Sequence, residues 1–152
     1  MFEIELSTQA ETVRSVLAER GVPATLALLN KRTHYRFTGI YKLQGDAMHA
    51  VQVFDRTGQQ RSWVRAIPLG KSLCRFAIQH GEFQVTSAST DRRVAKHPYG
   101  GLVESYYGHL LLGREGEPYG TFIHFDLSAR EIDAQEVNFL REVVPLFGDY
   151  LD

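Results

Sequence analysis

The sequence predicts a single α+β domain over residues 1–152, built on a central antiparallel sheet of about five to six strands. Segments with apolar residues at every second position recur between turn residues, as in antiparallel sheets. Capping signals and apolar residues spaced three or four apart predict helices near both ends. The length of 152 residues and the 43% hydrophobic content suit one domain with its own core.

Two helices are expected first. Thr8 has the position of a helix cap, and the helix that it opens, over 8–20, ends at Gly21. Pro23 suits the first turn of a second, short helix that continues to about Lys31.

A meander of three strands follows. Alternation of apolar and polar residues starts at Tyr35, and Gly45 with Asp46 supplies turn chemistry before a return strand over 48–55. A third extended segment covers 63–68. The pattern predicts a β-hairpin extended by one further antiparallel strand.

The next part of the chain mixes helix, strand and loop. Ser72 is placed to cap a short helix that ends at Gly81, and a short strand covers 82–86. A single helical turn at 91–96 precedes a loop-rich stretch at 97–101.

Two long apolar strands, 104–113 and 118–126, are joined by a polar turn and are expected at the centre of the sheet. Asp133 and Glu136 form a capping box for a final helix over 133–151.

The final helix carries two apolar rows, one of which can cover the sheet. The second row is Phe139, Val143, Leu146 and Tyr150. Two interpretations stay open: both rows form one broad buried stripe, or the second row is exposed and pairs with a second copy. The helix 133–151 is therefore a candidate dimer contact, and Pro145 should kink it.

Charge and cysteine content argue against several classes of protein. Seventeen Lys and Arg against eighteen Asp and Glu give a formal net charge of -1, without the basic patch that nucleic acid or an anionic membrane attracts. A single cysteine cannot form an internal disulfide, which favours a reducing compartment. No stretch approaches the roughly 20 apolar residues of a membrane span, and the acidic start is unlike a signal peptide. A cytoplasmic protein without nucleic-acid or membrane partners is expected.

Motifs with specific chemistry are few. The Gly-Lys-Ser stretch at 70–72 resembles the end of a phosphate-binding loop, but Arg65 stands where that motif needs its first glycine. The six histidines are never three or four residues apart, so no metal site is expected, although His109 and His124 could meet on the central strands. Cys74 is either a nucleophile favoured by a helix N-terminus or a small buried apolar residue.

Short strings of residues carry a family resemblance between residues 26 and 147. The strings are 29–33 (LNKRT), 35–41 (YRFTGIY), 53–56 (VFDR), 67–70 (IPLG), 74–76 (CRF), 91–94 (DRRV), 97–99 (HPY), 105–108 (SYYG), 120–121 (GT) and 124–126 (HFD). In this order they resemble the GAF domain, a sensory module. The resemblance implies terminal helices on one face of the sheet and, on the other, a short helix plus loop lid over a small-molecule pocket.

The resemblance also implies a ligand and partners. GAF domains bind cyclic nucleotides, tetrapyrroles, haem or small metabolites, and the resemblance does not specify the ligand or cofactor of this chain. It implies a homodimer through the terminal helices and an output protein acting in trans. Bilin-binding members attach their pigment through a cysteine followed by histidine in the lid region, which this sequence lacks. Covalent bilin is therefore not expected.

The sequence is also similar to free methionine-R-sulfoxide reductases, which are stand-alone GAF proteins. Their reaction needs an attacking and a resolving cysteine, and here only Cys74 is present. We expect a small-molecule-binding sensory domain without catalytic activity. The alternatives are a reductase-like enzyme that uses Cys74 and a protein-interaction scaffold without a ligand.

Strand alternation assigns Ser105, Tyr107 and His109 to the lid face, because the neighbouring set is plainer and suits packing under the terminal helices. Other segments are expected to converge on the same pocket. Their candidate ligand-binding residues are Trp63, Cys74, Phe76, Arg92, Arg93, His97 and Tyr99. The alternative is that these side chains fill the core without leaving a cavity.

Overall fold

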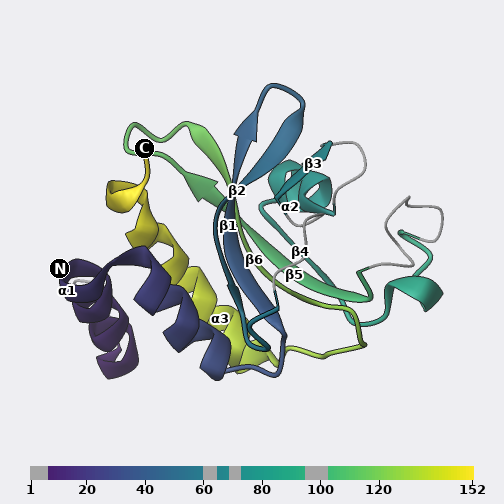
Figure 1. The fold of residues 1–152 in the computed structure, drawn as a ribbon, viewed down its shortest axis with the longest axis horizontal. Helices are drawn as coiled ribbons and strands as arrows, with labels where there is room; N and C mark the ends of the chain where they lie inside the picture. The colour runs from purple at the N-terminus through teal and green to yellow at the C-terminus, as the bar shows by residue number, and fades with distance from the viewer. Residues whose placement is uncertain (1–6, 60–64, 69–72, 95–102) are drawn as a thin grey trace, which may run out of the picture.

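The chain forms an antiparallel sheet with helices on both faces (Figure 1). The computed structural model describes residues 7–59, 65–68, 73–94 and 103–152. The elements in chain order are α1 (Thr8–Lys31), β1 (Phe37–Gln44), β2 (Ala47–Asp55), β3 (Ala66–Pro68), α2 (Cys74–His80), β4 (Glu82–Val85), η3 (Ala88–Thr90), β5 (Ser105–Leu112), β6 (Pro118–Asp126), α3 (Ala134–Val143) and η4 (Val144–Tyr150). The six strands lie in the order β3-β2-β1-β6-β5-β4 and confirm the predicted fold class.

The helix α1 contains the two helical segments predicted at the start, which are separated at Gly21, where the backbone is not helical. Its N-cap is Ser7, whose hydroxyl accepts a hydrogen bond from the Ala10 amide at 3.0 Å, so the prediction of Thr8 as the cap is one residue late. The kink lies at Gly21, where φ is 89°. A residue with a side chain rarely adopts this φ, which explains why the glycine interrupts the helix.

α1, α3 and η4 cover one face of the sheet, as the resemblance implies (Figure 1). Their apolar residues pack on Ile40, Tyr107 and Phe122 in a single buried cluster. Asp133 caps α3, since its carboxylate accepts a hydrogen bond from the Glu136 amide at 2.8 Å, which confirms one half of the predicted capping box. The Glu136 carboxylate accepts hydrogen bonds from Arg32 instead of completing the box.

The apolar row considered for dimer formation is mostly covered within the monomer. Phe139 and Val143 are buried in the cluster with α1, and Leu146 packs against it. Leu146 is half-buried, and Tyr150 has 43% of its surface exposed. The interpretation of one broad buried stripe is therefore confirmed, and the row gives no support to a homodimer. Helical geometry changes to 3-10 at Val144, next to Pro145.

α2 lies on the opposite face of the sheet (Figure 1). It begins at Cys74 with Leu73 at the N-cap position, later than predicted, and Ser72 is outside the described residues. Leu73, Cys74 and Ala77 pack on sheet residues that include Phe37 and Tyr106. The predicted short helix on this face is thus confirmed, and the predicted loop at 97–101 lies outside the described residues.

Candidate functional site

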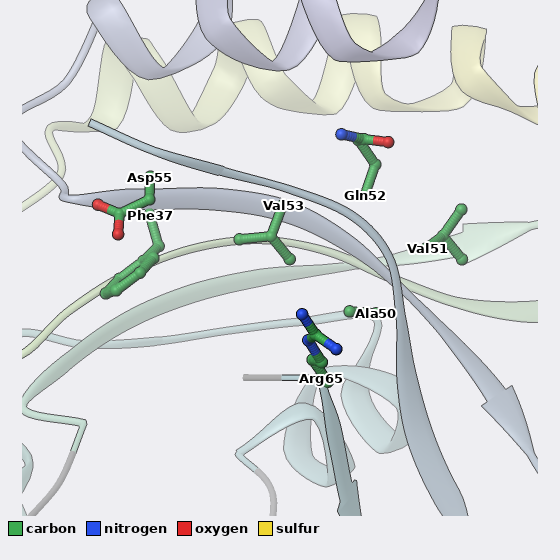
Figure 2. Close-up of a pocket in the computed structure, with 7 residues that line it drawn as sticks. All are labelled: Phe37, Ala50, Val51, Gln52, Val53, Asp55 and Arg65. Atoms are coloured by element: carbon green, nitrogen blue, oxygen red, sulfur yellow. The ribbon is translucent and has the colours of Figure 1, made fainter. Parts of the chain in front are cut away.

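A hollow of about 280 Å³ lies at the β1–β2 side of the sheet (Figure 2). Its lining residues are Phe37, Ala50, Val51, Gln52, Val53, Asp55 and Arg65, and we call it the β2 hollow. Figure 2 shows the side chains of Phe37, Val53 and Arg65 on one side of β2, whereas Gln52 points to the other side, toward the helices α1 and α3.

A β-bulge shapes the β2 hollow. In the β1–β2 ladder Ile40 pairs with Gln52 and Tyr41 with Ala50, which leaves Val51 without a partner on β1. A bulge bends its strand and disrupts the ladder locally, and bulges are common beside functional sites. Gly39 lies beneath the same region, where a Cβ would be 3.0 Å from both the Gln52 carbonyl oxygen and Val53 Cγ2.

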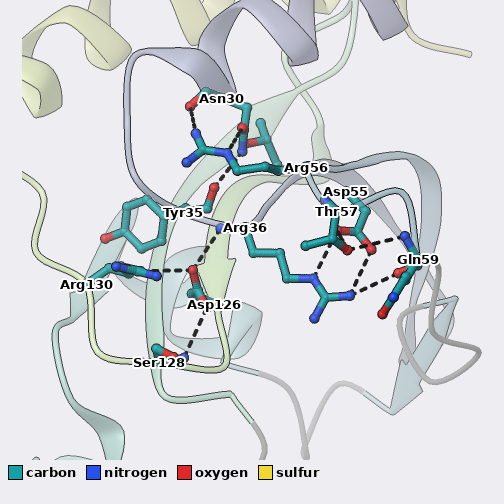
Figure 3. Close-up of polar contacts among 11 residues, drawn as sticks. Asn30, Tyr35, Arg36, Asp55, Arg56, Thr57, Gln59, Asp126, Ser128 and Arg130 are labelled. Atoms are coloured by element: carbon teal, nitrogen blue, oxygen red, sulfur yellow. Dashed lines mark hydrogen bonds and ion pairs between the residues drawn. The ribbon is translucent and has the colours of Figure 1, made fainter.

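Asp55 supplies the carboxylate among the described residues that line the β2 hollow, and this carboxylate is already neutralised. Arg36 Nε donates to Asp55 Oδ1 at 2.9 Å and its Nη2 to Oδ2 at 3.1 Å, while the amide and hydroxyl of Thr57 also donate to Oδ1 (Figure 3). Burial raises the pKa of Asp55, but the hydrogen bonds and charge of Arg36 and the hydrogen bonds of Thr57 outweigh it and lower the pKa. The Asp55 side chain is only 3% exposed.

Arg65 supplies the positive charge of the β2 hollow. Its carbonyl oxygen accepts a hydrogen bond from the Ala50 amide at 2.8 Å, which holds its backbone beside β2. The side chain is exposed and makes no ion pair with the residues that the structure describes. In Figure 2 its guanidinium extends over the same side of the strand as Val53.

Cys74 is part of the packed core beneath α2. It is 3% exposed, and its sulfur accepts a hydrogen bond from Thr121 Oγ1 at 3.2 Å. Tyr106 is also in this cluster, and burial raises its pKa well above the usual value. The structure therefore places the thiol as a small buried residue, the second of the two interpretations that the sequence left open.

The face assigned to Tyr107, Ser105 and His109 is reversed. Tyr107 belongs to the cluster under the terminal helices, and Tyr106 to the cluster under α2. The reason lies on the α2 face, where the Tyr106 ring covers Gly108, so that a Cβ on Gly108 would overlap it. The large Tyr106 side chain therefore fits on the α2 face because Gly108 has no side chain there. Comparing the apolar content of the two sides of the strand does not reveal this fit.

The remaining predicted residues are not gathered at one site. Trp63, His97 and Tyr99 lie outside the described residues. Phe76 stacks on Phe83 with ring centroids 4.7 Å apart. The Arg93 guanidinium lies 4.6 Å from the centre of the Phe83 ring. Arg92 is exposed.

Arg93 lies at the far edge of the sheet from the β2 hollow. Its Nη2 donates to the Gln84 carbonyl oxygen of β4 at 2.8 Å, and it pairs with Asp91. Because β4 and β2 are separated by β5, β6 and β1, Arg93 cannot serve the β2 hollow. It lines a separate polar hollow of about 600 Å³ with Asp91 and Glu131.

A buried polar network lies on the terminal-helix face, and no local pattern in the sequence predicts it. Asn30 Nδ2 donates to Thr38 Oγ1 at 2.8 Å, and Thr38 Oγ1 is 2.6 Å from His124 Nδ1. Arg56 donates from Nε to Asn30 Oδ1 at 3.1 Å (Figure 3). His124 lies opposite Tyr107 on β5, not opposite His109. Burial, with a smaller effect of the Arg56 charge, lowers the pKa of His124 to about 3.

Within the described residues, no three His, Cys, Asp or Glu side chains are grouped to hold a metal ion. In the same part of the chain, no helix combines the length and apolar character needed to cross a membrane.

No model of a known protein family matches this chain, and no curated protein does. Solved structures match it closely in fold. The free methionine-R-sulfoxide reductase from Neisseria meningitidis, in complex with its substrate, has a TM-score of 0.71 and 17% identity, over 97% of this chain and 93% of that chain. A putative GAF sensor protein from Burkholderia vietnamiensis has a TM-score of 0.72 and 19% identity, over 93% of this chain and 90% of that chain.

A phycocyanobilin-bound GAF domain from a cyanobacterial phytochrome is similar as well, with a TM-score of 0.71 and 13% identity over 95% of this chain and 93% of that chain. At these identities the likeness establishes the fold alone. The chain has the GAF fold, which its structural neighbours use both as sensor domains and as methionine-R-sulfoxide reductases.

Proposed function

We propose that this chain is a small-molecule-binding sensory module with the GAF fold, that its ligand binds in the β2 hollow, and that it has no redox activity. The observation that carries the proposal is the β2 hollow itself, with an apolar floor of Ala50 and Val53 and the guanidinium of Arg65 at its margin. Small-molecule sites combine an apolar lining with a few directed polar groups in this way.

The size of the hollow limits the ligand. At about 280 Å³ it is just below the range of roughly 300 to 1,000 Å³ that holds drug-sized ligands. A compact metabolite suits this volume better than a tetrapyrrole such as the pigment of the phytochrome neighbour. The only cysteine of the chain, Cys74, is buried in the core and does not line the hollow.

A sensor must convert ligand binding into a structural change at another surface. The end of β2 connects the β2 hollow to α1 and could carry such a change. Asp55 lines the β2 hollow, and the next residue, Arg56, holds the end of α1. Its Nη2 donates to the carbonyl oxygens of Asn30 at 3.0 Å and Thr33 at 2.8 Å (Figure 3). A ligand that displaces the end of β2 would therefore move the C-terminal end of α1, where an output protein or a second copy could detect the change.

Reductase activity is the second candidate, because the Neisseria enzyme matches nearly the full length of this chain. Reduction of a sulfoxide to a sulfide releases the oxygen as water and takes two electrons, from two thiols that become a disulfide. The 152 residues hold one thiol, which is 3% exposed. An assay of free methionine-R-sulfoxide with a dithiol reductant tests this candidate, and turnover that Cys74→Ser abolishes would establish it.

A thermal-shift screen against a metabolite library tests the proposal. A ligand at a hundredfold excess over its Kd stabilises the folded state by about 2.7 kcal/mol, a rise in Tm of roughly 5 to 10 °C for a chain of this length. Val53→Trp fills the β2 hollow, and Leu112→Trp is the matched control because this exposed residue of β5 does not line the hollow. We expect a compound that stabilises the wild type and Leu112→Trp but not Val53→Trp. An equal response of Val53→Trp, or no stabilising compound, would contradict the proposal.

A further inference from the structure

The charges around the β2 hollow determine which ligands suit it. Asp55 is the only acidic residue among its described lining residues, and both carboxylate oxygens are occupied by Arg36 and Thr57. Because this pair is neutral overall and largely buried, it offers no acceptor that would attract a cationic ligand. Arg36 is equally committed, since its Nη2 also donates to the Gln59 carbonyl oxygen at 3.1 Å.

Arg65 is the remaining charge, and it is available. The hydrogen bond between its carbonyl oxygen and the Ala50 amide holds the backbone beside the bulge in β2. Its guanidinium has no acidic partner in the described part of the chain and extends toward the side of Phe37 and Val53. A guanidinium binds a carboxylate through two parallel hydrogen bonds, which gives both affinity and orientation.

We infer that the β2 hollow binds a compact monocarboxylate, with its charged group on Arg65 and its apolar body on Ala50 and Val53. The inference rests on the proposed function and specifies its ligand class. A single unpaired guanidinium matches one negative charge, so a monoanion is favoured over a dianionic phosphate ester. The volume of about 280 Å³ and the apolar floor favour a short branched or aromatic body.

The test compares acids with amides of the same shape. The probes are 4-methylpentanoate, benzoate and phenylacetate, each with its primary amide, titrated up to about 10 mM into the full chain and followed by ligand-observed NMR. At least one acid should bind about tenfold more tightly than its amide, because charge-assisted hydrogen bonds are roughly twice as strong as neutral ones. The difference should shrink as salt is raised, since Arg65 is exposed.

Substitutions of Arg65 test whether its guanidinium causes the preference for acids over amides. Arg65→Gln should remove the preference for the acid, Arg65→Lys should keep part of it, and Arg20→Gln, the same change on the exposed surface of α1, should leave it unchanged. The inference is overturned if no acid binds, if amides bind as well as acids, or if Arg65→Gln retains the preference. A neutral or cationic compound from the metabolite screen that fails on Val53→Trp would overturn the ligand class and leave the proposed function standing.

Discussion

The burial of His124 makes the stability of the fold depend on pH. In the folded chain its pKa is lowered from 6.5 to about 3, first because burial disfavours the charged ring and second because of the Arg56 charge. Between these two values the unfolded chain binds a proton that the folded chain does not. The stabilisation is therefore complete above pH 6.5 and is lost progressively as the pH falls toward 3.

The size of the effect follows from the unfolded-state pKa. Between pH 7.5 and pH 5.5 the unfolded histidine becomes mostly protonated, while the folded one stays neutral. The free energy of unfolding should fall by about 1.4 kcal/mol over this range from this residue alone. The result does not depend on the exact folded pKa, provided that it lies well below 5.5.

The assay is urea denaturation of the wild type and His124→Asn at both pH values. Asparagine does not titrate, and its side-chain oxygen can replace Nδ1 as the acceptor for Thr38 Oγ1. Other titrating groups cancel when the two proteins are compared. The wild type should lose about 1.4 kcal/mol more than the variant. Equal losses in both proteins would refute the argument that His124 is buried and neutral.

The packing of the described residues gives three other predictions, two for substitutions and one for a labelling reaction. Gly120→Ala should destabilise the fold by about 3 kcal/mol, seen as a lower Tm, because its Cβ would overlap the Tyr41 carbonyl oxygen on the neighbouring strand; a neutral effect would mean that these strands are further apart. Asn30→Ala should cost about 1 to 3 kcal/mol in urea denaturation, because it leaves the Arg56 Nε without its side-chain acceptor, and an unchanged midpoint would show that this contact is unimportant. Cys74 should react with a thiol reagent such as dithionitrobenzoate far more slowly in the native chain than in urea, because it is 3% exposed; rapid native labelling would reopen the reductase candidate.

Local signals in the sequence predicted most of the elements. Gly81 ends α2 with a φ of 91°, as a left-handed terminator should, and Asp133 caps α3. These features depend on residues a few positions apart. The strand segments could be found for the same reason, since alternation is visible within each strand.

Features that depend on contacts between distant residues could not be predicted. The side of the sheet that each β5 residue faces depends on how Tyr106 fits over Gly108 beneath α2. The apolar content of the strand alone predicts the opposite orientation. The pairing of His124 with Thr38 joins residues 86 positions apart. Its existence depends on the β1–β6 register, in which these two residues lie opposite each other.

The candidate site was missed for a similar reason. In the sequence, Arg65 is a mismatch to a phosphate-binding motif, and Val51 is an ordinary strand residue. Neither residue has a local pattern that predicts a binding site. The bulge that leaves Val51 unpaired appears only when β1 and β2 are aligned. The hollow beside it could not be read from spacing.

The most direct test of the account is the chemical-shift map of the ¹⁵N-labelled chain titrated with the compound that stabilises it most. We expect the largest amide shifts at Phe37, Val53 and Arg65, which line the β2 hollow. Smaller shifts should extend through Arg56 to the end of α1 near Asn30. Shifts confined to the polar hollow around Arg93, or to the outer surface of the terminal helices, would contradict the claim that the chain binds its ligand in the β2 hollow.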